Sequence, residues 1–193
     1  MKLHKGDCLN IMKSMPDKSV DMIFTSPPFK EEDVKGNYWE FYTEAFTQMM
    51  RVTAKALIVV HSSTKMNHII STWPPKRTLI WGKGFSQMSY RYNPIFIYQI
   101  SDEYKVNKYI WADVFGVPSV SNPQKIHKYQ DPLILYETVI KMFKGCVSVL
   151  DPFMGSGTTG VACKRLNIEF TGIEIDKENF ATAKRRIDEE PTK

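Results

Sequence analysis

The sequence predicts an α/β fold with a mostly parallel sheet, and two observations carry that prediction. Short apolar runs of strand length alternate along the chain with segments of helical periodicity, which is typical of α/β domains. In addition, the apolar run Val147–Leu150 leads into a glycine-rich turn and then a helix-like segment, the local arrangement of a Rossmann-type fold. A chain of 193 residues is expected to form one domain, covering residues 1–193.

The expected strands are apolar runs of four to six residues, the length and character of strands buried within a sheet. In chain order they are Val20–Phe24, Ala56–Val60, Thr78–Trp81, Pro94–Gln99, Val147–Leu150 and Phe170–Ile173.

The expected helices are segments in which apolar residues recur on one face. They are Tyr38–Val52, Lys65–Thr72, Asp131–Phe143, Gly157–Leu166 and Lys177–Ile187. In the first of these, the apolar face carries Phe41, Ala45, Phe46 and Met49. No element is predicted for Lys30–Asn37 or Ser101–Tyr129, and loops of that length inside a compact domain usually serve a function.

Composition and charge narrow the class of protein. The net charge of +5 at pH 7 and the pI near 9.0 favour a polyanionic partner. The three cysteines are scattered and odd in number, which argues against a disulfide framework and favours a reducing cytosol. No apolar stretch is long enough to cross a bilayer and the amino terminus lacks a signal-peptide core, so we expect a cytoplasmic protein. The four histidines show no metal-ligand spacing with the cysteines, and no metal site is predicted.

The segment Thr25–Phe29, with the sequence Thr-Ser-Pro-Pro-Phe, follows the predicted strand Val20–Phe24. Two prolines make this turn rigid, because each proline ring fixes the backbone torsion φ. The turn offers a hydroxyl group, backbone carbonyls that no helix or sheet uses, and a flat ring. These groups could hold an exocyclic amine on a flat heterocycle and stack on the face of that heterocycle.

A second signature, Asp-Pro-Phe-Met-Gly-Ser-Gly-Thr-Thr-Gly, spans residues 151–160 and matches the pattern Gly-x-Gly-x-x-Gly. Glycines allow the backbone to approach a ligand closely, and the amino terminus of the following helix presents free amide groups. Glu174 ends the next strand, where a carboxylate can accept hydrogen bonds from two ribose hydroxyls. The turn alone fits a dinucleotide or another nucleoside cofactor. A phosphate-binding loop of the Walker type is excluded because Val161 follows Gly160.

With both turns present, the chain resembles the amino-methyltransferases that modify DNA at cytosine-N4 or adenine-N6 using S-adenosylmethionine. It is similar to the permuted subgroup, in which the catalytic turn precedes the cofactor turn. The resemblance covers most of the chain and implies a Rossmann-like methyltransferase fold, with a seven-stranded sheet and helices on both faces. The segments that carry it are Gly6–Cys8, Thr25–Phe29, His127–Leu133, Asp151–Thr159 and Gly172–Asp176. Within the third segment, Asp131 stands where the family usually has lysine.

The resemblance also implies roles for residues of these segments. Asp7 is expected to contact the adenine end of the cofactor, and the segment around Gln130 to flank its methionine moiety. The residues expected to bind the cofactor are Asp7, Cys8, Thr25, Gln130, Pro132, Asp151, Phe153, Gly155, Ser156, Gly157, Thr158, Thr159 and Glu174. The residues expected to be catalytic are Ser26, Pro27, Pro28 and Phe29.

An exocyclic amine on a base is a poor nucleophile because its lone pair is delocalised into the ring. Hydrogen bonds from the amine to the Ser26 side chain and the Pro27 carbonyl would favour a pyramidal nitrogen and free that lone pair. Phe29 would stack on the base after it leaves the double helix. Serine rather than aspartate or asparagine at position 26 favours cytosine-N4 as the target, with adenine-N6 as the alternative. No proline is followed by cysteine, the pair that cytosine-C5 chemistry would require.

Double-stranded DNA is the expected partner, in the setting of restriction–modification. The cations expected to contact DNA lie in the loop after the catalytic turn and in a region rich in tryptophan and tyrosine. They are Lys30, Lys35, Lys83 and Arg91. The segment expected to recognise the target sequence is short, around residues 101–126. We therefore expect a short or relaxed recognition sequence, or help from a homodimer partner or a separate specificity subunit.

Other functions remain open at this stage. A nicotinamide-dependent oxidoreductase would explain the glycine pattern, although it would leave the segment Thr25–Phe29 without a role. A nucleic-acid-binding module that has lost its chemistry would explain the charge, although the intact Asp151 and Glu174 argue against it. Structured RNA is a further possible substrate.

Overall fold

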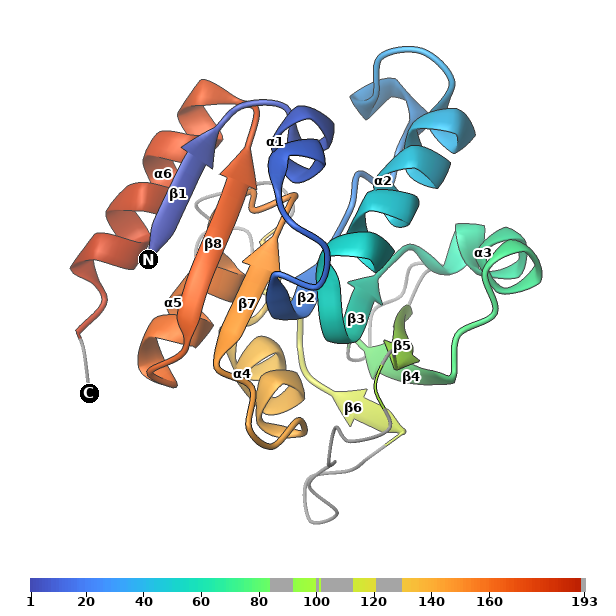
Figure 1. Cartoon of the computed structure of the whole chain (residues 1–193). Coiled ribbons are helices and arrows are strands. Elements are labelled where there is room, and N and C mark those ends of the chain that lie inside the picture. Colours follow the sequence, from blue (N-terminus) through green and yellow to red (C-terminus); the bar gives the residue numbers. More distant parts are fainter. Residues whose placement is uncertain (84–91, 100, 102–112, 121–129, 192–193) are drawn as a thin grey trace.

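The computed structural model describes residues 1–83, 92–99, 101, 113–120 and 130–191. In this part of the chain the centre of the fold is one eight-stranded sheet with the order β1-β8-β7-β2-β3-β5-β4-β6 (Figure 1). The strands are β1 (Lys2–Lys5), β2 (Val20–Thr25), β3 (Thr53–Val60), β4 (Arg77–Gly82), β5 (Tyr92–Gln99), β6 (Val114–Gly116), β7 (Ser148–Asp151) and β8 (Glu169–Glu174). Only the pairings of β5 with β3 and β4 are antiparallel among these strands, and the other five neighbouring pairs are parallel.

Six α-helices lie on the two faces of the described sheet. They are α1 (Cys8–Ser14), α2 (Tyr38–Val52), α3 (Met66–Thr72), α4 (Leu133–Lys141), α5 (Thr158–Arg165) and α6 (Lys177–Glu189). Two short 3-10 turns, η1 (Glu31–Asp33) and η2 (Ser63–Lys65), precede α2 and α3. The helices α1, α2 and α3 contribute Met12, Tyr42 and Ile69 to one buried apolar cluster. The helices α4, α5 and α6 contribute to the other.

The central strands are apolar throughout because both of their faces are covered. In β2, Ile23 belongs to the cluster under α1–α3, whereas Met22 and Phe24 belong to the cluster under α4–α6. The same alternation occurs in β3, where Leu57 and Ile58 point to opposite faces. The predicted mostly parallel sheet with helices on both faces is therefore confirmed.

The predicted elements are all present, with small shifts of their ends. The helix Tyr38–Val52 has the predicted bounds, and the Asn37 side chain caps it by accepting hydrogen bonds from the Trp39 and Glu40 amides. The helix α4 is shorter than predicted at both ends, and at its start Pro132 disfavours a helical conformation of the residue before it.

The expected number of seven strands is wrong for the described chain, which has eight. The strand β6 lies at the sheet edge within a stretch for which no element was predicted, and it pairs in parallel with β4. Two features tie it there: the Ile80 amide donates to the Asp113 carbonyl at 2.7 Å, and Arg77 forms an ion pair with Asp113. Three residues that pair through backbone groups leave almost no pattern in a sequence.

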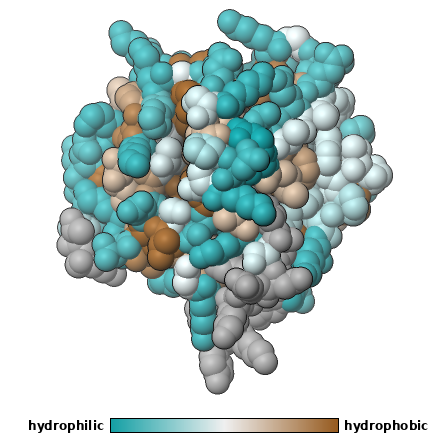
Figure 2. Space-filling model, in the orientation of Figure 1, coloured by the Kyte–Doolittle hydropathy of each residue, from teal (hydrophilic) through white to brown (hydrophobic). Residues whose placement is uncertain are grey.

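On the face shown in Figure 2, hydrophilic residues predominate and hydrophobic residues appear in separate small areas. No described helix has the length and apolar character needed to span a membrane.

Since β1, β8, β7 and β2 are parallel neighbours, their carboxyl ends meet at one edge of the sheet. In open α/β sheets, ligands bind outside this edge.

Candidate active site

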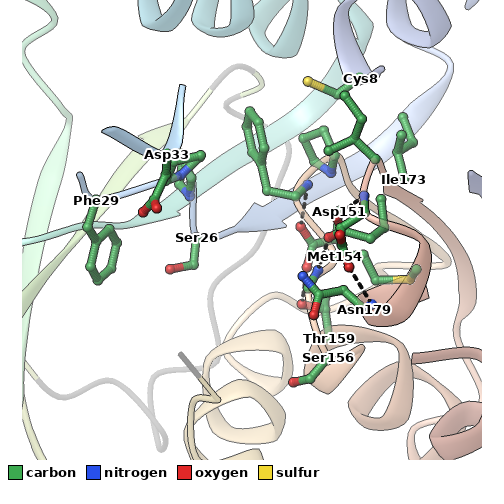
Figure 3. Close-up of a pocket in the computed structure, with 18 of the residues that line it drawn as sticks. Cys8, Ser26, Phe29, Asp33, Asp151, Met154, Ser156, Thr159, Ile173 and Asn179 are labelled. Carbon is green, nitrogen blue, oxygen red and sulfur yellow. Dashed lines mark hydrogen bonds between the residues drawn. The ribbon is translucent and has the colours of Figure 1, made fainter. Parts of the chain in front are cut away.

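A cavity of about 980 Å³ opens at the carboxyl ends of these strands. It is lined by both sequence signatures, although they are separated by more than a hundred residues in the chain. Figure 3 shows the two groups on opposite sides of the view, with Ser26 and Phe29 on one side and Asp151, Ser156 and Thr159 on the other. The expected site residues that line it are Asp7, Cys8, Ser26, Pro27, Pro28, Phe29, Gln130, Asp151, Phe153, Gly155, Ser156, Thr158, Thr159 and Glu174.

The turn that follows β2 is held from behind by a tyrosine and a histidine. The Pro28 carbonyl accepts a hydrogen bond of 2.8 Å from the Tyr38 hydroxyl. The Phe29 ring is stacked on the buried ring of His61, with 5.2 Å between the ring centroids. The turn therefore presents Ser26 and Phe29 to the cavity from a fixed backbone.

Asp151, at the end of β7, joins the two signatures. Its carboxylate accepts hydrogen bonds from the Thr25 hydroxyl (2.6 Å), the Thr159 hydroxyl (2.5 Å) and the Phe153 amide (3.1 Å). Burial raises the pKa of Asp151 to about 6, because removing water disfavours the charged form, and the three hydrogen bonds oppose that shift. Asp151 thus fastens the start of the turn Thr25–Phe29 to the glycine-rich turn and to α5.

Glu174, at the end of β8, fixes the other side of the glycine-rich turn. One carboxylate oxygen accepts from the Gly155 amide and the other from the Asp176 amide, both at 2.8 Å. Burial raises its pKa, and the backbone hydrogen bonds act in the opposite direction. A carboxylate has about four acceptor sites, so Glu174 keeps acceptor capacity on the cavity side.

Of the two glycines expected to bind the cofactor, Gly155 and Gly157, only the first lies at the cavity. Gly157 has φ of +81°, and a Cβ atom there would lie 3.0 Å from the Ala183 Cβ on α6. A Cβ on Gly160 would overlap with the side chains of Ile187 and Phe170. Gly157 and Gly160 therefore permit close packing of α5 against α6 and β8, and they do not line the cavity.

Two further expected cofactor residues lie outside the cavity wall. Thr25 is fully buried and its hydroxyl donates to Asp151, so it acts on the site through that carboxylate. Pro132 is buried at the start of α4. Asp7 and Cys8 do line the cavity, where Asp7 also caps α1 by accepting from the Asn10 amide at 3.0 Å. Burial raises the pKa of the Cys8 thiol to about 12, which keeps it neutral.

The expected DNA-contacting cations are divided. Lys35 and Lys83 line the cavity, and Lys83 lies over the Trp81 ring at 5.3 Å. Lys30 does not line it and forms an ion pair with Glu32 at 2.8 Å. Arg91 lies outside the described residues, as does most of the expected recognition segment, of which only 101 and 113–120 are described. Among the described residues, no group of three or more potential ligands is arranged to hold a metal ion.

Some residues of the cavity wall were not singled out from the sequence. Asn179 lies in the first turn of α6, and Ile175 is an exposed apolar residue directly after Glu174. Tyr136 donates to the Asp131 carboxylate at 2.7 Å and stacks on Phe24, with 4.4 Å between ring centroids. Tyr136 is one of the buried residues of α4, and no sequence signal indicated that it lines the cavity or contacts Asp131.

The chain is similar to known DNA methyltransferases. The family described as DNA methylase matches residues 20–185. The type II methyltransferase M2.MboI of Moraxella bovis is 25% identical over 240 residues, which cover 97% of this chain and 87% of the relative. M.BglII of Bacillus subtilis is 26% identical over 250 residues, covering 98% of this chain and 69% of the relative.

Among solved structures, the PvuII DNA methyltransferase (cytosine-N4-specific) matches with a TM-score of 0.80 and 17% identity, over 95% of this chain and 85% of that chain. The M1.HpyAVI–SAM complex matches with a TM-score of 0.76 and 23% identity, over 97% and 98% of the two chains. These likenesses confirm the α/β methyltransferase fold.

Proposed function

The chain belongs to the DNA methylase family, and on that premise we propose that it transfers a methyl group from S-adenosylmethionine to the exocyclic N4 amine of cytosine in DNA. The observation that carries this proposal is the convergence of the Ser-Pro-Pro-Phe turn and the glycine-rich turn on one cavity. A methyl transfer needs its two reactants side by side, and a cavity with one signature on each side meets that requirement.

The half of the cavity around β7 and β8 fits the cofactor. Each carboxylate oxygen of Glu174 accepts one hydrogen bond from a backbone amide, which orients it. Because a carboxylate oxygen can accept two hydrogen bonds, Glu174 can still accept from the ribose hydroxyls. Asp7 and Cys8 lie at the end of β1, beside Glu174, where the adenine end would bind. Gln130 lines the cavity and is proposed to flank the methionine moiety. When bound, S-adenosylmethionine supplies an electrophilic methyl group on its sulfonium sulfur.

The half formed by the turn after β2 fits the target base. The Ser26 side chain and the Pro27 carbonyl accept hydrogen bonds from the amine and orient its lone pair. Phe29 stacks on the base, and its own ring is held by His61 on the opposite side. Because the methyl group is transferred directly, the contribution of these residues is position and orientation, and no covalent enzyme intermediate is needed.

Cytosine-N4 is proposed over adenine-N6 because of Ser26. A hydroxyl at this position replaces the carboxylate or amide that adenine enzymes of the family more often use. The match to the cytosine-N4-specific PvuII enzyme supports this choice at the level of fold. Adenine-N6 stays the second candidate, since the family includes both activities.

The test is incubation of the full chain with labelled S-adenosylmethionine and mixed-sequence duplex DNA, followed by mass spectrometry of the nucleosides. N4-methylcytosine is the expected product. N6-methyladenine would retain the fold and the mechanism but overturn the interpretation of Ser26. A parallel incubation with structured RNA tests the remaining substrate, and methylated RNA in the absence of methylated DNA would contradict the proposal.

Recognition of DNA is part of the proposal. Lys35 and Lys83 at the cavity are proposed to contact phosphates, and the segment around 101–126 to read bases, alone or with a homodimer partner or specificity subunit. The type II methyltransferases among the relatives favour a role in restriction–modification. Size-exclusion chromatography with and without duplex DNA distinguishes a monomer from a dimer in each state.

A further inference from the structure

At its centre, the turn that presents Ser26 and Phe29 has no backbone donor. Pro27 and Pro28 have no N–H group, so only their carbonyl oxygens can hold this part of the chain by hydrogen bonds. An outside donor is therefore needed. The structure provides one in Tyr38, whose hydroxyl donates to the Pro28 carbonyl at 2.8 Å.

Tyr38 is itself held by His61, which follows β3 and has no exposed surface. The Tyr38 hydroxyl oxygen lies 2.9 Å from His61 Nε2. On the other side of the ring, the Ser62 amide donates to His61 Nδ1 at 2.7 Å. A nitrogen that accepts a hydrogen bond carries no proton, so in the neutral ring the proton is on Nε2.

These contacts fix the direction of every hydrogen bond in the series. The Ser62 amide donates to His61 Nδ1, His61 Nε2–H donates to the Tyr38 oxygen, and the Tyr38 hydroxyl donates to the Pro28 carbonyl. Burial and the nearby Lys65 ammonium lower the pKa of His61 to about 3, which keeps the ring neutral and this order intact.

The His61 ring also supports the next residue of the turn. It stacks on Phe29 with an angle of 28° between the ring planes. Lys65 closes the outer side, with its ammonium 4.2 Å from the centre of the Tyr38 ring and 2.9 Å from Glu31 in η1. Neither Tyr38 nor His61 lines the cavity, so both act through residues that do.

We propose that Tyr38 and His61 are positioning residues that hold the Pro28 carbonyl and the Phe29 ring, and thereby keep the catalytic turn in the form that accepts the target amine. This inference rests on the proposed function. The hydrogen bond occupies the Pro28 carbonyl and leaves the Ser26 hydroxyl and the Pro27 carbonyl to the amine. Small displacements of such groups have large effects on rate, about a hundredfold for 1 Å.

The test compares Tyr38→Phe with Tyr42→Phe. Tyr42 lies one turn further along α2 in the same aromatic cluster, and its buried hydroxyl has no hydrogen-bond partner in the described part of the chain. We expect Tyr38→Phe to lower the single-turnover methylation rate about tenfold or more, with the dissociation constant of S-adenosylmethionine within about twofold of wild type. Tyr42→Phe should methylate at the wild-type rate. Equal rates for wild type and Tyr38→Phe would overturn the inference.

A second pair of variants separates positioning from packing. In His61→Gln, the amide nitrogen reaches the place of Nε2 and can still donate to Tyr38. In His61→Asn, the shorter side chain reaches only the place of Nδ1. Both variants lose the ring, so a faster rate for His61→Gln than for His61→Asn is expected only if the hydrogen bond to Tyr38 matters. Equal rates would contradict the inference.

Nuclear magnetic resonance of the ¹⁵N-labelled histidine rings gives a readout that needs no activity. We expect His61 as the neutral Nε2–H tautomer in wild type, and an Nδ1–H tautomer or a charged ring near neutral pH would overturn the inference. If the wild-type enzyme methylates no nucleic acid, the proposed function fails. The tautomer still decides whether the hydrogen-bonded series exists.

Discussion

Asp151 should make the folded chain less stable as the pH rises through weakly acidic values, and Asp151→Asn should remove that effect. Burial raises the pKa of this carboxyl group to about 6 in the folded chain, from 3.8 in the unfolded chain. Below pH 3.8 the Asp151 carboxyl group is protonated in both the folded and the unfolded chain, so its titration does not change the free energy of unfolding. Between 3.8 and 6 the unfolded chain loses the proton first, so the free energy of unfolding falls as the pH rises.

The size of the effect follows from the two pKa values. They differ by about 2.2 units (6 minus 3.8), and each unit corresponds to ~1.4 kcal/mol, so the cost above pH 6 reaches about 3 kcal/mol. About 2 kcal/mol of it develops between pH ~4.5 and ~7.5. Asparagine avoids this cost, and it can keep the contacts: its oxygen accepts from Thr25 and Phe153, and its amide donates to the Thr159 hydroxyl.

The assay is urea denaturation of wild type and Asp151→Asn at these two pH values. The free energy of unfolding of Asp151→Asn minus that of wild type should be about 2 kcal/mol larger at pH ~7.5 than at pH ~4.5. Asp188→Asn, which removes an exposed carboxylate of α6, controls for the general effect of losing a charge. A relative stability of Asp151→Asn that does not change with pH would refute the reasoning, because it would mean that burial does not disfavour the ionised carboxylate.

Two other predictions concern packing and DNA binding. Gly157→Ala should destabilise the fold by about 1–3 kcal/mol more than Gly145→Ala, as measured by urea denaturation. Both glycines have positive φ, but only a Cβ atom at position 157 would meet the Ala183 Cβ, at 3.0 Å. Equal losses of stability would show that the contact with α6 costs nothing. Lys35→Ala and Lys83→Ala should each lower the slope of log affinity against log salt by about one unit for any duplex. Lys184→Ala, whose side chain pairs with Asp188 on α6, should leave that slope unchanged; equal slopes for all three variants would argue against phosphate contacts at the cavity.

The sequence predicts best the elements whose burial produces a local pattern of apolar residues. The strand β2 and the helix α2 are examples, since β2 is buried along most of its length and α2 has one apolar face. The strand β1 carries no such pattern, because Lys2–Lys5 is an exposed edge strand held by backbone pairing with β8. The sequence also does not show that β5 runs antiparallel to its neighbours β3 and β4, because buried parallel and buried antiparallel strands have similar compositions.

The candidate site was predictable where one short motif carries several functional residues. Ser26 and Phe29 line the cavity as expected, and so do the expected residues of the turn from Asp151 to Thr159 with the exception of Gly157. The contacts that orient those motifs were not predictable, because they join residues far apart in the chain. In the sequence, Tyr38 is one residue of a predicted helix and His61 is an isolated histidine. Only the folded chain places them behind the turn Thr25–Phe29.

The central claim is that one cavity has a target half at Ser26 and a cofactor half at Glu174. The most direct measurement compares Ser26→Ala with Glu174→Gln, for single-turnover methylation and for binding of S-adenosylmethionine. Ser26→Ala should reduce the methylation rate by at least about tenfold and leave cofactor affinity unchanged. Glu174→Gln should weaken cofactor binding by about 10- to 100-fold, since it removes charged acceptors. Normal turnover in Ser26→Ala, or unchanged cofactor affinity in Glu174→Gln, would contradict this account.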